Sequence, residues 1–92
     1  MTAKETKRQN LFDEDALQSE IRNLILHNDD VHTFDYVIDA LMEICDHEYI
    51  QASQCAIITH YKGKCDIKQG VFSSLKVMKD ALTQKELTTT ID

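Results

Sequence analysis

The residues best suited to chemistry in this chain are three consecutive polar side chains, Asn28, Asp29 and Asp30. They follow the apolar run of residues 24–26, where a strand is expected to end and a helix to begin. Rigid elements on both sides hold such a junction still, and binding sites are therefore common there. Two carboxylates and an amide with no adjacent Lys or Arg suit a positively charged ligand. The sequence thus predicts a site for a cation, either a metal ion or an organic amine.

The elements on either side of this site follow from the spacing of the apolar residues. Residues 21–27 are a short apolar run bounded by polar residues, which is typical of a β-strand. From Phe34 to Cys45 apolar residues recur every three or four positions, and this pattern predicts an amphipathic helix. Thr33 is the expected N-cap, because its hydroxyl can accept from the first free amides. Residues 28–32 are then a loop.

A second helix is expected to end near Tyr61, with Asp46-His47 available to cap its start. Gly63 is the expected C-terminal stop, since a positive φ costs glycine little. Five residues are predicted to form the buried side of this helix: Ile50, Cys55, Ala56, Ile58 and Thr59.

The remaining pattern predicts a strand over 64–68, a turn at Gln69-Gly70, a third helix and a final strand over 87–91. Ser73 or Ser74 is expected to cap the third helix. Its apolar residues are Leu75, Val77, Met78, Ala81 and Leu82. The order β-α-α-β-α-β predicts a small two-layer α+β sandwich, with three helices on one face of a three-stranded antiparallel sheet.

The length and charge of the chain narrow the function. Ninety-two residues allow one domain, expected as a flexible N-terminal extension over 1–19 and a core domain over 20–92. A core of this size leaves room for a shallow pocket only. The net charge of −6 and the lack of a basic patch disfavour nucleic-acid binding. No membrane span or signal peptide is visible, so the expected location is the cytoplasm.

Two other chemistries are less well supported by the sequence. A metal would have to be held by residues drawn from a nine-residue window whose spacing matches no known metal-binding loop. Its donors would be His27, Asp29, Asp30, His32 and Asp35. A Cys-His nucleophile pair is disfavoured because Cys55 and His60 are five residues apart, and at that spacing they do not lie on the same face of a helix. The three cysteines, Cys45, Cys55 and Cys65, are expected to be buried small hydrophobes.

Recognition of an amine fits the residues better. An ammonium group has three donors, and Asn28, a carboxylate of Asp29 or Asp30, and a neutral His60 would supply acceptors. This requires the end of the second helix to lie beside the loop of residues 28–32. Otherwise His60 is an exposed histidine that interacts with the helix dipole.

Four segments in order resemble the ClpS family, the N-degron adaptors of Clp AAA+ proteases. They lie between Asn23 and Ile91, nearly the whole expected core domain. The segments are Leu24-Ile25-Leu26-His27-Asn28-Asp29-Asp30, Phe34-Asp35-Tyr36-Val37-Ile38-Asp39-Ala40-Leu41, His60-Tyr61-Lys62-Gly63-Lys64 and Gly70-Val71-Phe72.

The resemblance implies roles for individual residues. Asn28, Asp30 and His60 would hold the α-amino group of a substrate, with Asp29 in the same loop. His32 stands where the family often has Thr and would contact the substrate backbone. The pocket for the first side chain would be lined by Phe34, Val37, Ala56, Thr59 and Leu87. Phe34 and Ala56 stand at positions that are commonly Met in the family, and His32-Thr33 replaces its Thr-Pro pair.

The resemblance also implies a function and partners. The protein would bind N-terminal Leu, Phe, Tyr or Trp of substrate proteins and deliver them to a Clp AAA+ unfoldase of the ClpA or ClpC type. It would be a monomer, not an enzyme, and would need no cofactor, nucleic acid or membrane. The alternative is a ClpS-fold regulator that binds a Clp unfoldase without reading N-degrons.

Overall fold

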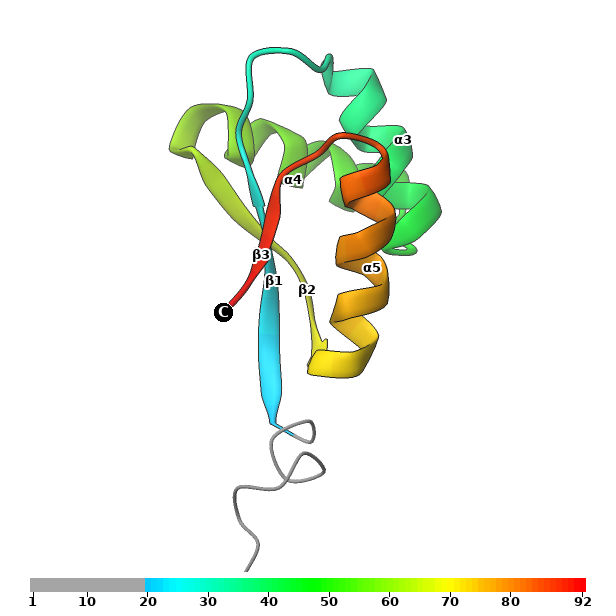
Figure 1. Cartoon of the computed structure of the whole chain (residues 1–92). Helices are drawn as coiled ribbons and strands as arrows, with labels where there is room; N and C mark the ends of the chain where they lie inside the picture. Colours follow the sequence, from blue (N-terminus) through cyan, green and yellow to red (C-terminus); the bar gives the residue numbers. More distant parts are fainter. Residues whose placement is uncertain (1–19) are drawn as a thin grey trace, which may run out of the picture.

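The computed structural model describes residues 20–92; the predicted N-terminal extension lies outside the described residues. The elements follow one another in the predicted order β-α-α-β-α-β (Figure 1). Their bounds are β1 Ile21–His27, α3 Phe34–Ile44, α4 Tyr49–Lys62, β2 Lys64–Val71, α5 Phe72–Gln84 and β3 Thr89–Ile91. Among these residues no helix is long and apolar enough to cross a membrane.

The three strands form an antiparallel sheet in the order β2-β1-β3. β1 is central: it pairs with β2 from Ile21 opposite Val71 to His27 opposite Lys64. It also pairs with the short strand β3, with Leu26 opposite Thr89.

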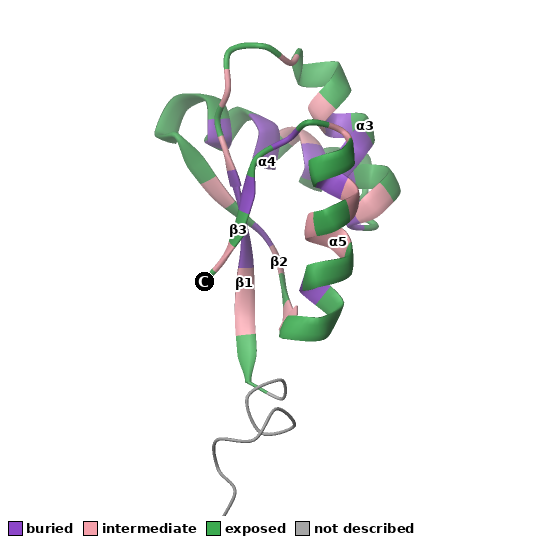
Figure 2. Ribbon diagram, viewed as in Figure 1, coloured by how far each residue is buried: buried purple, intermediate pink, exposed green. Residues whose placement is uncertain are grey.

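The core lies between the sheet and all three helices (Figure 2). Leu24 and Leu26 of β1 point into it and are 0% and 1% exposed. Because alternate residues of a strand face opposite sides, they place the core on one face of the sheet. The helices contribute Ile38, Ala40, Leu41, Ala52, Cys55, Ala56, Leu75 and Leu82 to the same cluster. The predicted two-layer sandwich is confirmed.

Two helix ends agree with the sequence prediction. The hydroxyl of Thr33 accepts a hydrogen bond from the backbone N–H of Tyr36 at 3.1 Å and caps α3. Gly63 has a φ of 93° and donates its N–H to the carbonyl of Thr59 at 2.9 Å, which ends α4. The left-handed conformation at Gly63 is what requires glycine there.

The start of α4 differs from the prediction. Glu48 is its N-cap, and Asp46-His47 does not cap it. His47 is instead buried, and its Nε2 lies 2.6 Å from the carbonyl of Ile67. Ile67 sits where the pairing of β1 with β2 shifts register, so its carbonyl is available to a side chain. This contact draws the link between α3 and α4 into the core.

The buried face of α4 also differs. Ile50 and Ile58 were predicted to be buried, but they are 69% and 41% exposed. The buried residues are Ala52, Cys55, Ala56 and Thr59, at helical spacing. Small residues therefore face the sheet, and this lets α4 pack closely against it.

The second half of the chain departs from prediction at three points. Gln69-Gly70 is not a turn, because both residues pair with β1 and lengthen β2. α5 then starts directly at Phe72 with Val71 as N-cap, so neither Ser73 nor Ser74 caps it. Val77, one of the apolar residues of this helix, is 70% exposed. The final strand is confined to Thr89–Ile91, although Leu87 is buried just before it.

Candidate functional site

One hydrogen bond fixes the loop between β1 and α3 against the end of α4. The backbone N–H of Asn28 donates to the carbonyl of Gly63 at 2.9 Å. His60 lies one helical turn before Gly63, so this bond brings the imidazole into the neighbourhood of the loop. The juxtaposition that amine recognition requires is therefore present.

A small cavity of about 40 Å³ lies between the loop, α3 and α4. It is far smaller than the roughly 300–1,000 Å³ of typical small-molecule pockets, and it is shallow, as the size of the domain predicts. Of the predicted site residues, those that line it are Asn28, Asp29, His32, Phe34, Val37, Ala56, Thr59, His60 and Leu87. Leu26, His27 and Thr33 line it as well and were not predicted. Their positions beside the loop, at the end of β1 and at the α3 cap, are the signal that would have included them.

Asp30 is the predicted site residue that the cavity does not include. It is exposed in the loop, next to Val31, which is 80% exposed. Its side chain is therefore open to solvent.

Two aromatic rings stand together on the cavity wall. Phe34, at the first position of α3, is 45% exposed. Its ring meets that of His60 edge to face, with centroids 5.3 Å apart and planes at 70°. Phe34 and His60 together form one side of the cavity.

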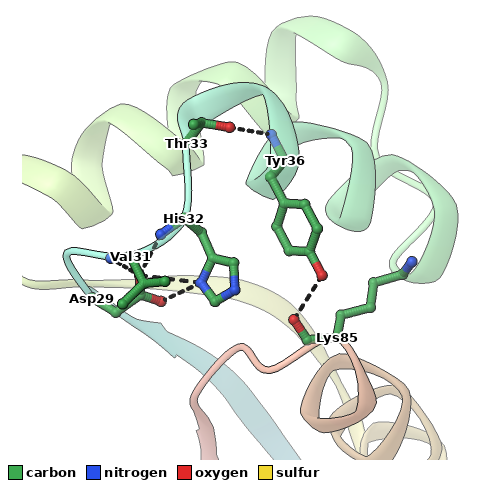
Figure 3. Close-up of polar contacts among 6 residues, drawn as sticks. All are labelled: Asp29, Val31, His32, Thr33, Tyr36 and Lys85. Atoms are coloured by element: carbon green, nitrogen blue, oxygen red, sulfur yellow. Dashed lines mark hydrogen bonds and ion pairs between the residues drawn. The ribbon is translucent and has the colours of Figure 1, made fainter.

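Asp29 is engaged by its own loop (Figure 3). Its Oδ1 accepts from the backbone N–H groups of Val31 and His32 at 2.8 and 2.9 Å. Its Oδ2 lies 3.0 Å from Nδ1 of His32. Burial opposes ionisation, but the hydrogen bonds from His32 and Val31 outweigh it and hold the pKa of Asp29 below its usual range. Asp29 is thus an ionised carboxylate that shapes the loop.

His32 connects the loop to α3 and, through Tyr36, to the segment that follows α5. Its ring stacks on that of Tyr36 with centroids 4.7 Å apart and planes at 18°. The Tyr36 hydroxyl donates to the backbone carbonyl of Lys85 at 2.8 Å. Figure 3 shows this series of contacts from Asp29 to Lys85. Lys85 lies in the connection that carries Leu87, so the loop and the pocket wall formed by Leu87 are braced together.

The cysteines lie apart from the cavity. Cys45 and Cys55 are buried and Cys65 is partly buried, and all three are free thiols. Burial raises the pKa of Cys45 to about 11 and that of Cys65 to about 12, and it also raises the pKa of Cys55. The thiols are therefore protonated at neutral pH and poor nucleophiles. Within residues 20–92 no three His, Cys, Asp or Glu side chains are grouped so as to hold a metal ion.

The fold is a small α+β sandwich with a pocket between the loop after β1 and the end of α4. Comparison with known proteins identifies its family. The family profile described as ATP-dependent Clp protease adaptor protein ClpS matches residues 19–90. The chain therefore belongs to the ClpS family.

Two relatives agree with this assignment. The ATP-dependent Clp protease adapter protein ClpS of Pectobacterium carotovorum is 36% identical over 52 residues, which are 56% of this chain and 47% of that protein. The match thus spans about half the length of that relative. The structure of Agrobacterium tumefaciens ClpS2 bound to L-phenylalaninamide superposes with a TM-score of 0.74 at 16% identity, covering 80% of this chain and 96% of the other. At that identity the likeness supports the fold.

Proposed function

We propose that this protein is an adaptor that binds the N-terminal residue of substrate proteins and delivers them to a Clp AAA+ unfoldase. The observation that carries the proposal is the convergence of Asn28 and His60 on one small cavity, through the bond from Asn28 to Gly63. Polar acceptors at the rim and an apolar interior match an α-amino group followed by an apolar side chain. The family profile and the relative from Pectobacterium support the adaptor role.

The α-amino group would be held by three acceptors. Asn28 offers its amide oxygen, His60 a ring nitrogen and Asp30 a carboxylate, which together match the three donors of an ammonium. Asp29 supports them indirectly, because its oxygens already accept from Val31 and His32. An acetylated N-terminus carries neither the charge nor the donors of an ammonium, so it would leave these acceptors unpaired.

The first side chain would enter the cavity itself. Val37, Ala56, Thr59 and Leu87 provide its wall, and Ala56 leaves room where a larger residue would fill it. The Thr59 hydroxyl donates to the carbonyl of Cys55 at 2.7 Å, so it is occupied within α4. An exposed charge pair contributes only about 0–1 kcal/mol. The apolar contact must therefore supply much of the affinity, and this favours Leu, Phe, Tyr and Trp.

A second function is favoured by the cavity volume. The cavity of about 40 Å³ is small beside typical ligand pockets, and Phe34 stands next to it with its ring against His60. If Phe34 does not move, the protein would act as a ClpS-fold regulator that binds a Clp unfoldase without reading N-degrons. In either role we propose a cytoplasmic monomer without catalytic activity.

Fluorescence polarisation with labelled peptides separates the two functions. The series is four peptides of one sequence that begin with Phe, Leu, Val or acetyl-Phe. An N-degron adaptor binds the free Phe and Leu peptides and rejects the Val and acetyl-Phe peptides. Equal affinity for free and acetylated Phe would rule out the amine site. No binding of any peptide, together with binding to a Clp unfoldase, would assign the regulator.

A further inference from the structure

A second, larger groove lies between α5 and β3 and shares no residue with the cavity of the amine site. Its volume is about 360 Å³, and it is lined by Phe72, Lys76, Lys79, Thr89, Thr90 and Ile91. Phe72, Lys76 and Lys79 are spaced along one face of α5. The two elements that border the groove, α5 and β3, are labelled in Figure 1.

The outer edge of β3 has unused backbone groups. β3 is an edge strand, since the sheet order is β2-β1-β3. Asn23 and Asp92 exchange hydrogen bonds at 3.1 and 2.8 Å, and His27 donates to the carbonyl of Thr88 at 2.9 Å. Hydrogen-bonded pairs alternate along an antiparallel ladder, so Thr89 and Ile91 direct their N–H and C=O groups away from β1. Within residues 20–92 no backbone or side-chain group pairs with them.

A buried hydroxyl in the same groove also lacks a partner. Thr89 is 4% exposed, and within the described part of the chain its Oγ1 makes no hydrogen bond. Buried polar side chains in folded proteins nearly always have a partner, and one that lacks it calls for an explanation. The hydroxyl is enclosed on the core side of β3, so the open edge of the strand offers its backbone groups rather than this oxygen.

The groove is positively charged on one side and apolar on the other. Lys76 forms an ion pair with Asp80 at 2.9 Å. The ammonium of Lys79 has no ion pair or hydrogen bond to another residue of the range 20–92 and is free to meet an anion. Phe72, 37% exposed, and the partly buried Ile91 supply the apolar surface.

We propose that this groove binds an extended, acidic segment of a partner protein, which adds a strand to the free edge of β3. Main-chain pairing with Thr89 and Ile91 would hold the segment, as in other cases of strand addition to a sheet edge. A carboxylate of the segment would meet Lys79, and an apolar residue would cover Phe72 and Ile91. Because an internal segment has no free α-amino group, this site is independent of the proposed N-degron site.

An array of N-acetylated, C-amidated hexapeptides tests the proposal with the full chain. The acetyl cap keeps the peptides out of the amine site. Bound peptides are expected to alternate Asp or Glu with apolar residues. For the best of them, measured by fluorescence polarisation, the double variant Lys76→Glu/Lys79→Glu should lower affinity at least tenfold and shift the array preference toward Lys and Arg. No acidic preference in the array would overturn the proposal.

Lys64→Glu is the control, because it reverses one lysine at β2, the opposite edge of the sheet. It should change affinity less than twofold. If this variant loses as much peptide affinity as the groove variant, the binding depends only on the overall charge of the protein, and the proposal is overturned. Amide hydrogen exchange with the selected peptide should protect Thr89 and Ile91. Protection confined to other elements would place the peptide elsewhere and overturn it as well.

The chain's own acidic residues Asp13, Glu14 and Asp15 are the competing occupant. Charge reversal of these three in the full chain should leave peptide affinity unchanged, and a tenfold gain would assign the groove to them instead.

Discussion

The backbone N–H of Asn28 and the carbonyl of Gly63 lie 2.9 Å apart, and this contact joins the loop after β1 to the end of α4. Two segments more than thirty residues apart in the sequence thereby form one pocket. The carbonyl of Gly63 points toward the loop because the chain turns there through a left-handed residue, with φ at 93°. The geometry of the proposed amine site therefore depends on a helix C-cap.

Gly63→Ala should destabilise the domain by about 1–2 kcal/mol, because a residue with a Cβ disfavours the left-handed conformation. A Cβ at this position would meet no atom within 4 Å, so the cost is conformational rather than steric. Urea unfolding measures it. Gly70→Ala is the control, since a Cβ there makes only an ordinary 3.7 Å contact with Leu75. Equal losses in the two variants would contradict the role of the left-handed φ.

The sequence predicts the structure correctly at residues whose conformation depends on their neighbours along the chain. Thr33 caps α3 and Gly63 ends α4 because both effects act within one helical turn. The strand at residues 21–27 was predicted from the apolar run of its own residues, although it pairs with both β2 and β3. The predictions that fail depend on distant partners. Gln69-Gly70 joins β2 because β1 lies alongside, and His47 turns inward because Ile67 offers a carbonyl.

One part of the proposed site could be predicted from the local sequence and another part could not. The loop of polar residues is evident from the sequence, whereas the position of His60 beside it depends on how α4 packs. The resemblance to a family supplied that step, and the bond from Asn28 to Gly63 supplies its physical basis. The contacts from His32 to Tyr36 and from Tyr36 to Lys85 could not be predicted, because they require the exact course of the chain at Lys85.

Asp30→Ala should weaken binding of a free Phe peptide, by up to about fivefold for an exposed charge pair, without unfolding the domain. Asp30 is exposed and outside the cavity lining, so its removal leaves the core unchanged. Fluorescence polarisation measures the affinity, and circular dichroism confirms the fold. Asp35→Ala is the control, an exposed carboxylate in the first turn of α3. If Asp30→Ala binds like the unmodified protein, Asp30 does not hold the amine.

Asp29→Asn should destabilise the domain at pH 7 by roughly 1–3 kcal/mol, since the charged acceptor of the loop is lost. The pKa of Asp29 is lowered in the folded state. Its ionisation therefore adds stability that is present above the unfolded pKa of about 3.9 and is lost as pH falls through the lower folded pKa. Urea unfolding at pH 7, 5 and 3 measures the difference between the two proteins. That difference should shrink at the lowest pH, and a constant difference would exclude ionisation of Asp29 as its cause.

Phe34→Met should increase affinity for peptides that begin with Trp more than for those that begin with Leu. The Phe34 ring lies against His60 beside a cavity of about 40 Å³, and a large indole needs more of that space than an isobutyl group. Methionine is flexible and can move aside at lower cost. Ala56→Met is the opposite change, because it fills the cavity from α4 and should reduce Trp binding most. Fluorescence polarisation with both peptides and both variants gives the ratio of Trp to Leu affinity. If the ratio moves in the same direction in the two variants, pocket volume does not set the preference.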